Sequence, residues 1–421
     1  MLDPGRVREL VPRLSIALAV GRGARRLSKI TGRGRGNVVG GHIALGIEPR
    51  ALHILAAGRP TVLVSGTNGK TTTTRFLARA AALAGPVVSN DDGANLPRGL
   101  VSVLMNRDVE PGARLVAEVD ERWLPAVVEA TRPEVVVLLN LSRDQLDRME
   151  EVRSTASRWR EGLSVDAAAR TTVVANADDP IVVAAVPENA KAVWVGAGLR
   201  WRDDAATCPW CGQRIVWESD DQWRCADCGR TRPTVDWQLD GAALHRAGGG
   251  RVDLVLAVPG RHNLANAAMA IAAAAQLGVD PADAARACAT VEHVAGRYQH
   301  AWGPAHRGRV YLAKNPAGWI ETLDVLDADR RAVVLAFNSN GPDGRDPSWI
   351  YDVAFERLAD RRVIVTGERA TDLSVRLRYA DVAHRVVRPL AAALAEGRDL
   401  DADIVASYTA FGEVRHELDD G

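Results

Sequence analysis

The sequence Val-Ser-Gly-Thr-Asn-Gly-Lys-Thr-Thr-Thr-Thr, residues 64–74, decides how this chain folds. The apolar run 61–64 before it is typical of a buried strand, and residues 76–83 after it are typical of a helix. A glycine-rich turn between a strand and a helix directs backbone N–H groups and the helix N-terminus toward an anion. The stretch therefore predicts a phosphate-binding loop in an α/β fold.

Two side chains of this loop have a specific use in nucleotide binding. Lys70 would reach the terminal phosphates, and the Thr71 hydroxyl would bind the metal ion that accompanies them. Val64 stands where the usual G-x-x-x-x-G-K-T pattern has its first glycine, so this is a shorter, variant P-loop. The chain has only four lysines, and a lysine kept among so many arginines indicates a compact charge in a tight loop. The loop residues predicted to bind the nucleotide are Gly66, Thr67, Asn68, Gly69, Lys70, Thr71 and Thr72.

The composition indicates a globular protein of two or three domains. Of the 421 residues 47% are hydrophobic, and the net charge of zero argues against a general nucleic-acid binder. Residues 1–60 nevertheless hold eleven basic residues against three acidic ones. This basic N-terminal segment is either a solvated face or a surface for anionic lipid or pyrophosphate headgroups.

No apolar run reaches the roughly 18 residues needed to span a bilayer. The run 14–20 is too short, and no cleavage site for a secretory signal follows it. We therefore expect a cytoplasmic protein, with contact to the inner face of the membrane as a further hypothesis.

Four of the five cysteines form two C-x-x-C pairs, Cys208 with Cys211 and Cys225 with Cys228, separated by thirteen residues. This spacing predicts a tetrahedral Cys₄ zinc site, which is structural because four thiolates leave no open position. Residues 201–236 carry seven acids against five arginines, which does not favour a nucleic-acid-binding ribbon. Cys288, in an alanine-rich helix, is expected to be a small core residue.

Short apolar runs alternate with helical stretches after the loop, as in a parallel sheet covered on both faces. The candidate strands of this first unit are residues 114–118, 135–139, 172–175 and 192–195, followed by a hairpin that reaches residue 256. Alanine-rich helices are expected at 264–277 and 281–289. A second unit has candidate strands at 310–313, 332–337, 362–365 and 403–406.

These patterns predict an α/β protein in three parts. The first is the basic N-terminal segment 1–55, and the second is a central nucleotide-binding domain 56–298, for which the family resemblance described below implies ATP. The cysteine insert 201–236 interrupts the central domain. The third part is a Rossmann-like C-terminal domain 299–421.

Polar side chains follow several candidate strands at the sheet edge where ligands bind in open parallel sheets. The Glu118 carboxylate could reach the Mg²⁺ of the nucleotide, and Asn266 could contact an adenine edge. Arg297, at a domain junction, suits a contact with the γ-phosphate. A polar turn or a helix cap explains any one of these positions equally well, so it is their order along the chain that carries the information.

This order of motifs resembles the Mur ligase superfamily, whose members use ATP to join a carboxylate to an amine. The matching positions are Gly66 to Thr71, Glu118, Asn140, Asp144, Asp147, Arg148, Asn176, Asp179, His262, Asn266, Gly296 and Arg297. The cysteine insert, Lys314 and residues 338–349 further resemble the ligase subunits of the lipid II isoglutaminyl synthases. The resemblance covers nearly the whole chain and implies a Mur ligase-like central domain.

The resemblance implies that ATP phosphorylates the α-carboxyl of D-glutamate in the lipid II stem peptide, and that ammonia then attacks the acyl phosphate. It implies catalytic roles for Lys70, Glu118, Arg297 and Lys314, with Thr71 and Glu118 on Mg²⁺. Ammonia would come from a GatD-like glutaminase subunit, whose Cys–His pair an aspartate of this chain would orient. We favour Asp346 over Asp343 for this role, although both could simply cap the following helix.

Two departures from the superfamily pattern bear on the metal and on the substrate. Gln145 stands where these ligases have a histidine for a second magnesium ion, and no lysine lies between Lys70 and Lys191 to become carbamylated. A second magnesium ion is therefore either absent or held by waters and other groups. The residues before the loop are too few for the usual domain that binds a UDP-linked precursor, which agrees with a lipid-linked substrate.

Two rival functions stay open. One is an amino-acid-adding ligase of the folylpolyglutamate or muramyl type, which would need no partner and which residues 343–349 argue against. The other is a non-enzymatic, nucleotide-gated zinc-ribbon scaffold that binds nucleic acid. The combination of Lys70, Thr71, Glu118 and Arg297 argues against this scaffold.

Overall fold

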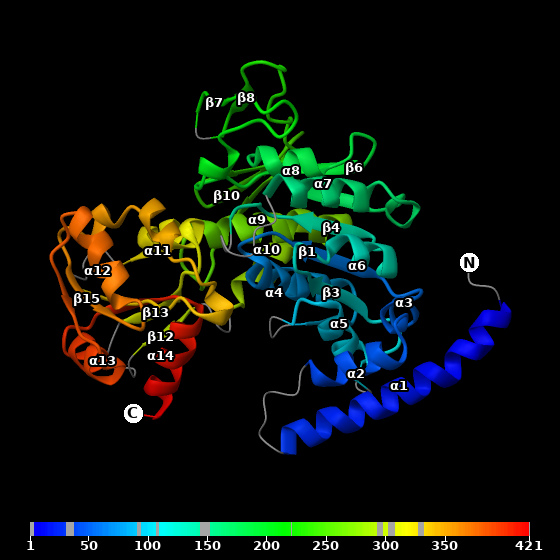
Figure 1. Ribbon diagram of the computed structural model, residues 1–421. Helices are drawn as coiled ribbons and strands as arrows, with labels where there is room; N and C mark the ends of the chain where they lie inside the picture. The colour runs from blue at the N-terminus through cyan, green and yellow to red at the C-terminus, as the bar shows by residue number, and fades with distance from the viewer. Residues whose placement is uncertain are drawn as a thin grey trace.

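Two α/β sheets and a small cysteine-bearing ribbon build the protein. Its computed structural model describes residues 4–30, 38–90, 94–106, 109–143, 152–219, 221–292, 298–301, 308–326 and 332–420. We call the part built on the nine-stranded sheet the central domain and the part built on the six-stranded sheet the C-terminal domain. In Figure 1 the C-terminal domain lies on the left, the central domain on the right and the ribbon at the top.

The central sheet has the strand order β11-β10-β9-β6-β5-β4-β1-β3-β2. Its strands run parallel from β2 to β9, whereas β9, β10 and β11 form an antiparallel meander, the hairpin predicted before residue 256. The strands are β1 (Thr61–Ser65), β2 (Val87–Ser89), β3 (Arg114–Glu118), β4 (Val135–Leu138), β5 (Thr172–Asn176), β6 (Lys191–Gly196), β9 (Trp237–Asp240), β10 (Ala243–Arg246) and β11 (Arg251–Asp253).

Helices cover both faces of this sheet, so all five residues of β1 are buried. Val62 and Val64 pack on one face against α4 (Lys70–Ala81), α9 (Arg261–Gln276) and α10 (Pro281–Ala289). Leu63 points to the other face. That face carries α5 (Pro97–Leu104), α6 (Leu124–Thr131), α7 (Val152–Leu163), α8 (Pro180–Ala185) and the N-terminal helices α1 (Pro4–Ile30), α2 (Val39–Ile47) and α3 (Ala51–Ala56).

Helix α4 begins earlier than its sequence pattern predicts. Residues 76–83 were expected to be helical, yet the helix starts at Lys70, directly after Gly69 in a left-handed conformation. The four threonines at 71–74 form its first turn although β-branched residues disfavour helices, because the turn is buried against the rest of the domain. The phosphate loop therefore continues directly into the first turn of α4.

The C-terminal sheet has the order β12-β13-β17-β14-β15-β16 and is parallel except for β12. Its strands are β12 (Tyr298–His300), β13 (Arg309–Leu312), β14 (Ala332–Ala336), β15 (Arg362–Thr366), β16 (His384–Val386) and β17 (Asp403–Ala406). The helices are α11 (Pro316–Val325), α12 (Ala370–Tyr379), α13 (Leu390–Asp399) and α14 (Tyr408–Asp420). Within the described residues, every helix is either too short or too polar to cross a membrane.

Candidate functional site

The phosphate loop is held in shape by side chains from two neighbouring elements. Gly69 has a φ of +87°, and a Cβ at this position would collide with Oδ1 of Asn266 in α9, so the site requires glycine. Asn140, after β4, accepts from the Asn68 backbone N–H at 2.9 Å and donates to the Asn68 carbonyl at 3.0 Å. The structure thus brings the predicted loop residues 66–72 together with Asn140 and Asn266.

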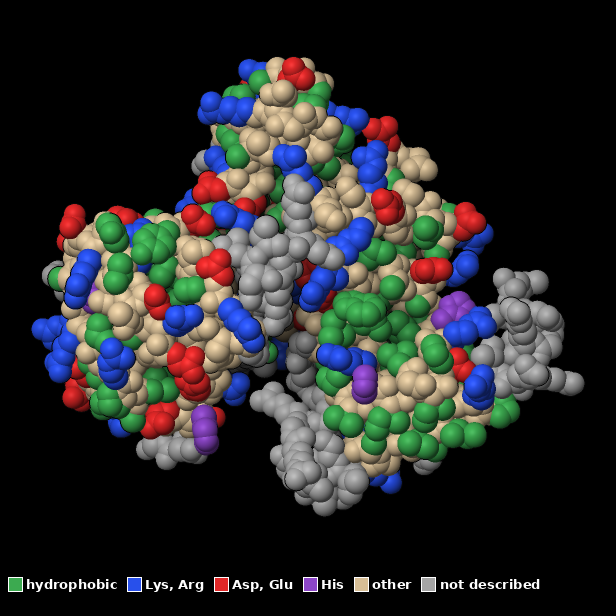
Figure 2. Space-filling view, in the orientation of Figure 1, with side chains coloured by type: hydrophobic (Ala, Val, Ile, Leu, Met, Phe, Trp, Pro, Cys, Tyr) green, Lys and Arg blue, Asp and Glu red, His purple; other side chains and the backbone are tan. Residues whose placement is uncertain are grey.

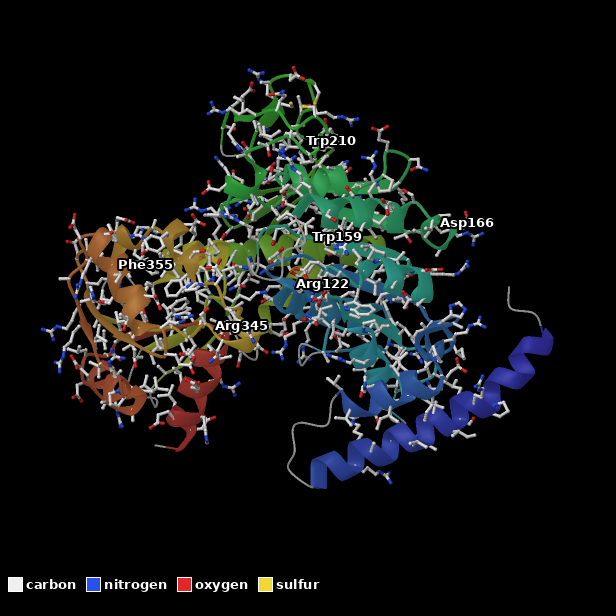
Figure 3. The ribbon with its side chains drawn as sticks, in the orientation of Figure 1. Arg122, Trp159, Asp166, Trp210, Arg345 and Phe355 are labelled. Atoms are coloured by element: carbon white, nitrogen blue, oxygen red, sulfur yellow. The ribbon has the colours of Figure 1, made fainter. Side chains whose placement is uncertain are left out.

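Lys70 lies at the centre of the loop and turns back onto it. Its Nζ donates to the carbonyl oxygens of Gly66 at 2.5 Å and Thr67 at 3.3 Å. It also forms an ion pair with Glu121 Oε2 at 3.1 Å, in which the Lys70 side chain is only 5% exposed. The Trp159 indole, labelled in Figure 3, donates to the Glu121 carbonyl at 2.8 Å.

Glu121 is a site residue to which sequence reasoning gave no role. Its position three residues after Glu118, in the same acidic turn, is the only signal in the sequence that points to it. In this arrangement the Glu121 carboxylate neutralises the Lys70 ammonium, so a phosphate group entering the loop competes with it for that charge. Glu121 therefore keeps Lys70 oriented in the loop.

Glu118 and Thr71 occupy positions suited to a magnesium ion. Glu118 ends β3 and pairs in register with Val64 of β1, two residues before Gly66. Its backbone is fixed by the Asn90 side chain, which accepts from the Glu118 N–H and donates to the Glu118 carbonyl, both at 2.9 Å. The Glu118 and Thr71 residues are 2% and 8% exposed. A buried carboxylate and a buried hydroxyl are both hard oxygen ligands of the kind that Mg²⁺ takes.

A cavity of about 180 Å³ separates the loop from the C-terminal domain. Asn68, Gly69 and Thr72 line it on one side, and Lys314 lines it on the other. Its walls are mostly apolar, with convergent amide groups, which suits a nucleotide base and ribose. Further lining residues are Leu139, Asn176, Leu199, Val258, Asn263, Asn266 and Met269.

Direct contacts join the two domains around this cavity. Asn68 in the loop and Asn315 in the C-terminal domain exchange side-chain hydrogen bonds at 3.3 Å. Asn315 is fully buried and caps α11 by accepting from the Gly318 N–H at 2.9 Å. An ion pair of Arg200, which also lines the cavity, with Asp324 at 2.9 Å adds a second contact between the domains. The C-terminal domain therefore presents Lys314 to the nucleotide side of the protein.

The aspartates 178 and 179 have structural roles at the edge of the cavity. Asp179 caps α8 and accepts from the Leu141 N–H at 2.9 Å, which holds the chain after β4. Burial raises the pKa of Asp179 to about 6. Asp178 accepts from Gly198, a cavity residue, at 2.6 Å and forms a buried ion pair with Arg232 at 2.5 Å. These carboxylates support the cavity wall.

The two aspartates of the 343–346 loop have different surroundings. Asp343 is 7% exposed and accepts from both the N–H, at 3.0 Å, and the hydroxyl of Thr409, at the start of α14. Asp346 is half-buried and accepts from the Ser348 N–H at 2.9 Å, which holds the pKa of its carboxyl below the usual value. Asp343 therefore holds the start of α14, whereas the Asp346 carboxylate contacts the backbone N–H and the side chain of Ser348. Arg345, labelled in Figure 3, marks the position of this loop.

The four cysteines of the insert converge as predicted. Their Sγ atoms all lie within 4.8 Å of one another, a cluster that could hold a metal ion. Cys208 and Cys211 precede the hairpin of β7 (Ile215–Trp217) and β8 (Trp223–Cys225), and Cys228 follows it. The Trp223 indole donates to the Ala177 carbonyl at 3.0 Å and anchors the ribbon on the central domain.

Some predicted positions lie outside the described residues. These are Arg297 with Gly296, and Asp144, Gln145, Asp147 and Arg148. The proposed γ-phosphate contact and the question of a second magnesium ion therefore stay predictions.

Comparison with known proteins agrees with this geometry. Residues 64–274, half of the chain, match the Mur ligase middle domain. The chain belongs to the Mur ligase family. Residues 312–411 of this Mur ligase match the MurT ligase C-terminal domain. Both the Mur ligase-like fold and the MurT-type resemblance predicted from the sequence are thereby confirmed.

Individual relatives cover nearly all of this Mur ligase. It is 28% identical to the lipid II isoglutaminyl synthase (glutamine-hydrolyzing) subunit MurT of Staphylococcus aureus strain N315, over 94% of this chain and 95% of the relative. The same-named subunit of Streptococcus pneumoniae is 26% identical, over 91% and 93%. Among solved structures, a pseudomurein peptide ligase type C from Methanothermus fervidus superposes with a TM-score of 0.66 at 19% identity, over 87% and 80% of the two chains. That structure supports the fold alone.

Proposed function

We propose that this Mur ligase is the ligase half of a two-subunit amidotransferase. It converts the α-carboxyl of D-glutamate in the lipid II stem peptide to the amide of D-isoglutamine, a step of peptidoglycan synthesis. The observation that carries the proposal is the interdomain cavity, where the P-loop of the central domain faces Lys314 of the MurT-type C-terminal domain. The names of the two MurT relatives supply the substrate and the reaction type.

The residues present fit an ATP-dependent phosphoryl transfer. ATP with Mg²⁺ would supply the activating phosphoryl group, held by the loop residues 66–72, with Thr71 and Glu118 as ligands of the ion. Lys70, released from Glu121, would stabilise negative charge on the transferring group. Asn266 would contact the adenine, and Arg297 the γ-phosphate. Lys314, on the opposite wall of the cavity, would orient the carboxylate or its acyl phosphate.

The chain's own cysteines do not provide a nucleophile for glutamine hydrolysis. Four of them belong to the cysteine cluster that could hold a metal ion, and Cys288 is fully buried in α10. Burial raises the pKa of the Cys288 thiol to about 12, so it is not a thiolate at neutral pH. We therefore propose that a GatD-like glutaminase subunit supplies the ammonia, and that Asp346 orients the histidine of its Cys–His pair. The complex would act in the cytoplasm at the inner face of the membrane.

The reaction can be tested with the purified chain alone. Supplied with ATP, Mg²⁺, lipid II and ammonium, it is expected to form amidated lipid II and one ADP per amide. Mass spectrometry of the stem peptide measures the product. The same reaction without ammonium is the control, because any product that still forms must have taken its nitrogen from a contaminating amino acid. ATP-dependent incorporation of an amino acid without any amidation would instead support the rival ligase, and no product of either kind would refute the assignment.

The cysteine cluster is proposed to hold one structural zinc ion. Metal analysis of the purified chain is expected to give about one zinc per chain, and a Cys208→Ser, Cys225→Ser double variant should lose it. Cys288→Ser is the matched control, because it removes a buried thiol outside the cluster and should keep the metal. Because the ribbon packs on the wall beside Gly198, the double variant should also melt at a lower temperature. A double variant with unchanged zinc content would contradict the assignment.

A further inference from the structure

A second hollow, separate from the nucleotide cavity, opens on the N-terminal side of the central domain. This groove has a volume of about 770 Å³ and lies among α2, α3, the start of α5 and the length of α6. Leu45, Leu52, Leu96 and Pro97 contribute apolar surface to it. Trp123 also lines it and leaves 44% of its surface exposed, which is unusual for so large an apolar side chain.

The rim of the groove is strongly basic. Arg50, Arg98 and Arg132 line it from three different segments, together with His42 and His53, and Glu129 is the acidic residue among the lining side chains. All three arginines are exposed, and none forms an ion pair with a carboxylate of the described residues. Elsewhere in the described structure many arginines are paired, for example Arg200, Arg232 and Arg376. Three unpaired guanidinium groups around an apolar floor suit a ligand that is both anionic and apolar.

The groove and the phosphate loop share two chain segments. The Asn95 carbonyl accepts from the Asp120 N–H at 3.0 Å, which joins the segment before α5 to the turn after β3. Leu96, the next residue, lines the groove. Glu121, which pairs with Lys70, is followed two residues later by Trp123, also in the groove. A molecule with one end in the groove therefore lies beside the turn that positions Lys70.

Exposed apolar side chains continue from the groove onto the N-terminal helices. Ile16 and Val20 of α1 are 58% and 47% exposed, and Val39 of α2 is 43% exposed. Figure 2 shows green hydrophobic side chains along this part of the molecule, with blue and purple side chains beside them. Apolar surface of this kind on a soluble domain marks a contact with lipid or with another apolar partner.

We infer that this groove binds the lipid-pyrophosphate end of the substrate. The guanidinium groups of Arg50, Arg98 and Arg132 bind the pyrophosphate, and the apolar floor with Trp123 takes the first isoprene units of the chain. The sugar and stem peptide then extend past the 95–97 and 119–123 segments toward Lys70. The inference rests on the proposed function for the nature of the substrate.

The test is a calorimetric titration of the full chain with farnesyl pyrophosphate, a short soluble analogue. A non-hydrolysable ATP analogue with Mg²⁺ is present throughout, so that the P-loop cannot bind the probe. Inorganic pyrophosphate, farnesol and phosphatidylglycerol vesicles form the comparison arms. Farnesyl pyrophosphate is expected to bind about tenfold or more tightly than inorganic pyrophosphate or farnesol, because only it engages both the rim and the floor.

Variants then locate the site. Arg98→Gln with Arg132→Gln should raise the Kd for farnesyl pyrophosphate by about tenfold or more, and Trp123→Ala should remove its advantage over inorganic pyrophosphate. Arg378→Gln is the matched control, an exposed arginine on α12 of the other domain. Unchanged affinity for the ATP analogue in each variant shows that the chain is folded. If the double variant does not fold, the two single arginine variants are titrated in its place.

Two results would overturn the inference: wild-type affinity in the double arginine variant, or equal competition by phosphatidylglycerol vesicles, which would mark a general membrane surface. Because the titration measures binding without turnover, it tests the groove independently of the proposed reaction. A chain that binds farnesyl pyrophosphate in the groove but forms no amide refutes the reaction alone. A chain that amidates lipid II but does not bind the analogue refutes the groove alone.

Discussion

Replacing Lys70 with alanine is expected to lower the amidation rate by about a thousandfold, with ammonium and with glutamine alike. The Lys70 ammonium is buried within the loop, 5% exposed, so little water is available to replace it as a stabiliser of phosphoryl charge. Lys70→Arg should not restore the activity, because the planar guanidinium does not fit where Nζ contacts the Gly66 and Thr67 carbonyls. Initial rates of ADP and amide formation measure both effects.

The matched control for this experiment is Lys191→Ala. Lys191 is an exposed lysine at the start of β6, and its loss should leave the rate unchanged within about twofold. The zinc content of the Lys70 variants should equal that of the wild type, since the Trp223 and Arg232 contacts that anchor the cysteine ribbon do not involve the loop. A Lys70→Ala variant with more than a tenth of the wild-type rate would show that the loop does not carry the chemistry.

Replacing Asp346 with asparagine is expected to separate the two nitrogen sources. With the proposed glutaminase subunit present, the glutamine-driven rate should fall by about a hundredfold or more, because the partner's histidine would lose the carboxylate that we propose orients it. The ammonium-driven rate should stay within about twofold of the wild type. Asparagine keeps an oxygen to accept from the Ser348 N–H, so the local turn is preserved while the negative charge is removed.

Asp343→Asn provides the contrasting variant. Asp343 holds the start of α14 through the Thr409 N–H and hydroxyl, so its substitution should lower the melting temperature and affect both rates together. The direct readout for Asp346 is the ratio of the glutamine-driven to the ammonium-driven rate, which a purely structural role would not change. Equal loss of both rates in Asp346→Asn would assign this aspartate to the turn rather than to the partner.

The sequence placed most of the secondary structure correctly, for a physical reason. Strands buried on both faces are continuous apolar runs, and β3, α10 and β17 have the bounds that the patterns predicted. The start of α4 could not be read in this way, because the threonine run after Lys70 has low helix propensity and is helical only through burial. The strands β2 and β16, three residues each, are too short to leave a pattern.

The candidate site likewise has parts that the sequence predicts and parts that it does not. The loop, Glu118, Asn266 and the cysteines are recognisable because each depends on residue type and spacing, and the structure places the first three around one end of the sheet. No sequence pattern reveals the pairing of Lys70 with Glu121 or the different roles of Asp343 and Asp346. Each depends on which group happens to lie within hydrogen-bonding distance once the chain has folded.

By itself the sequence determined the phosphate-binding type of loop, the fold class and the clustering of the four cysteines, since short local motifs carry backbone and ligand chemistry directly. Tertiary structure alone decided where the C-terminal domain meets the loop, through Asn68 and Asn315, which are far apart in the chain. It also assembled the basic groove from Arg50, Arg98 and Arg132, which no local pattern unites. Surfaces of this kind form from distant segments that pack together, so their charge becomes visible only in three dimensions.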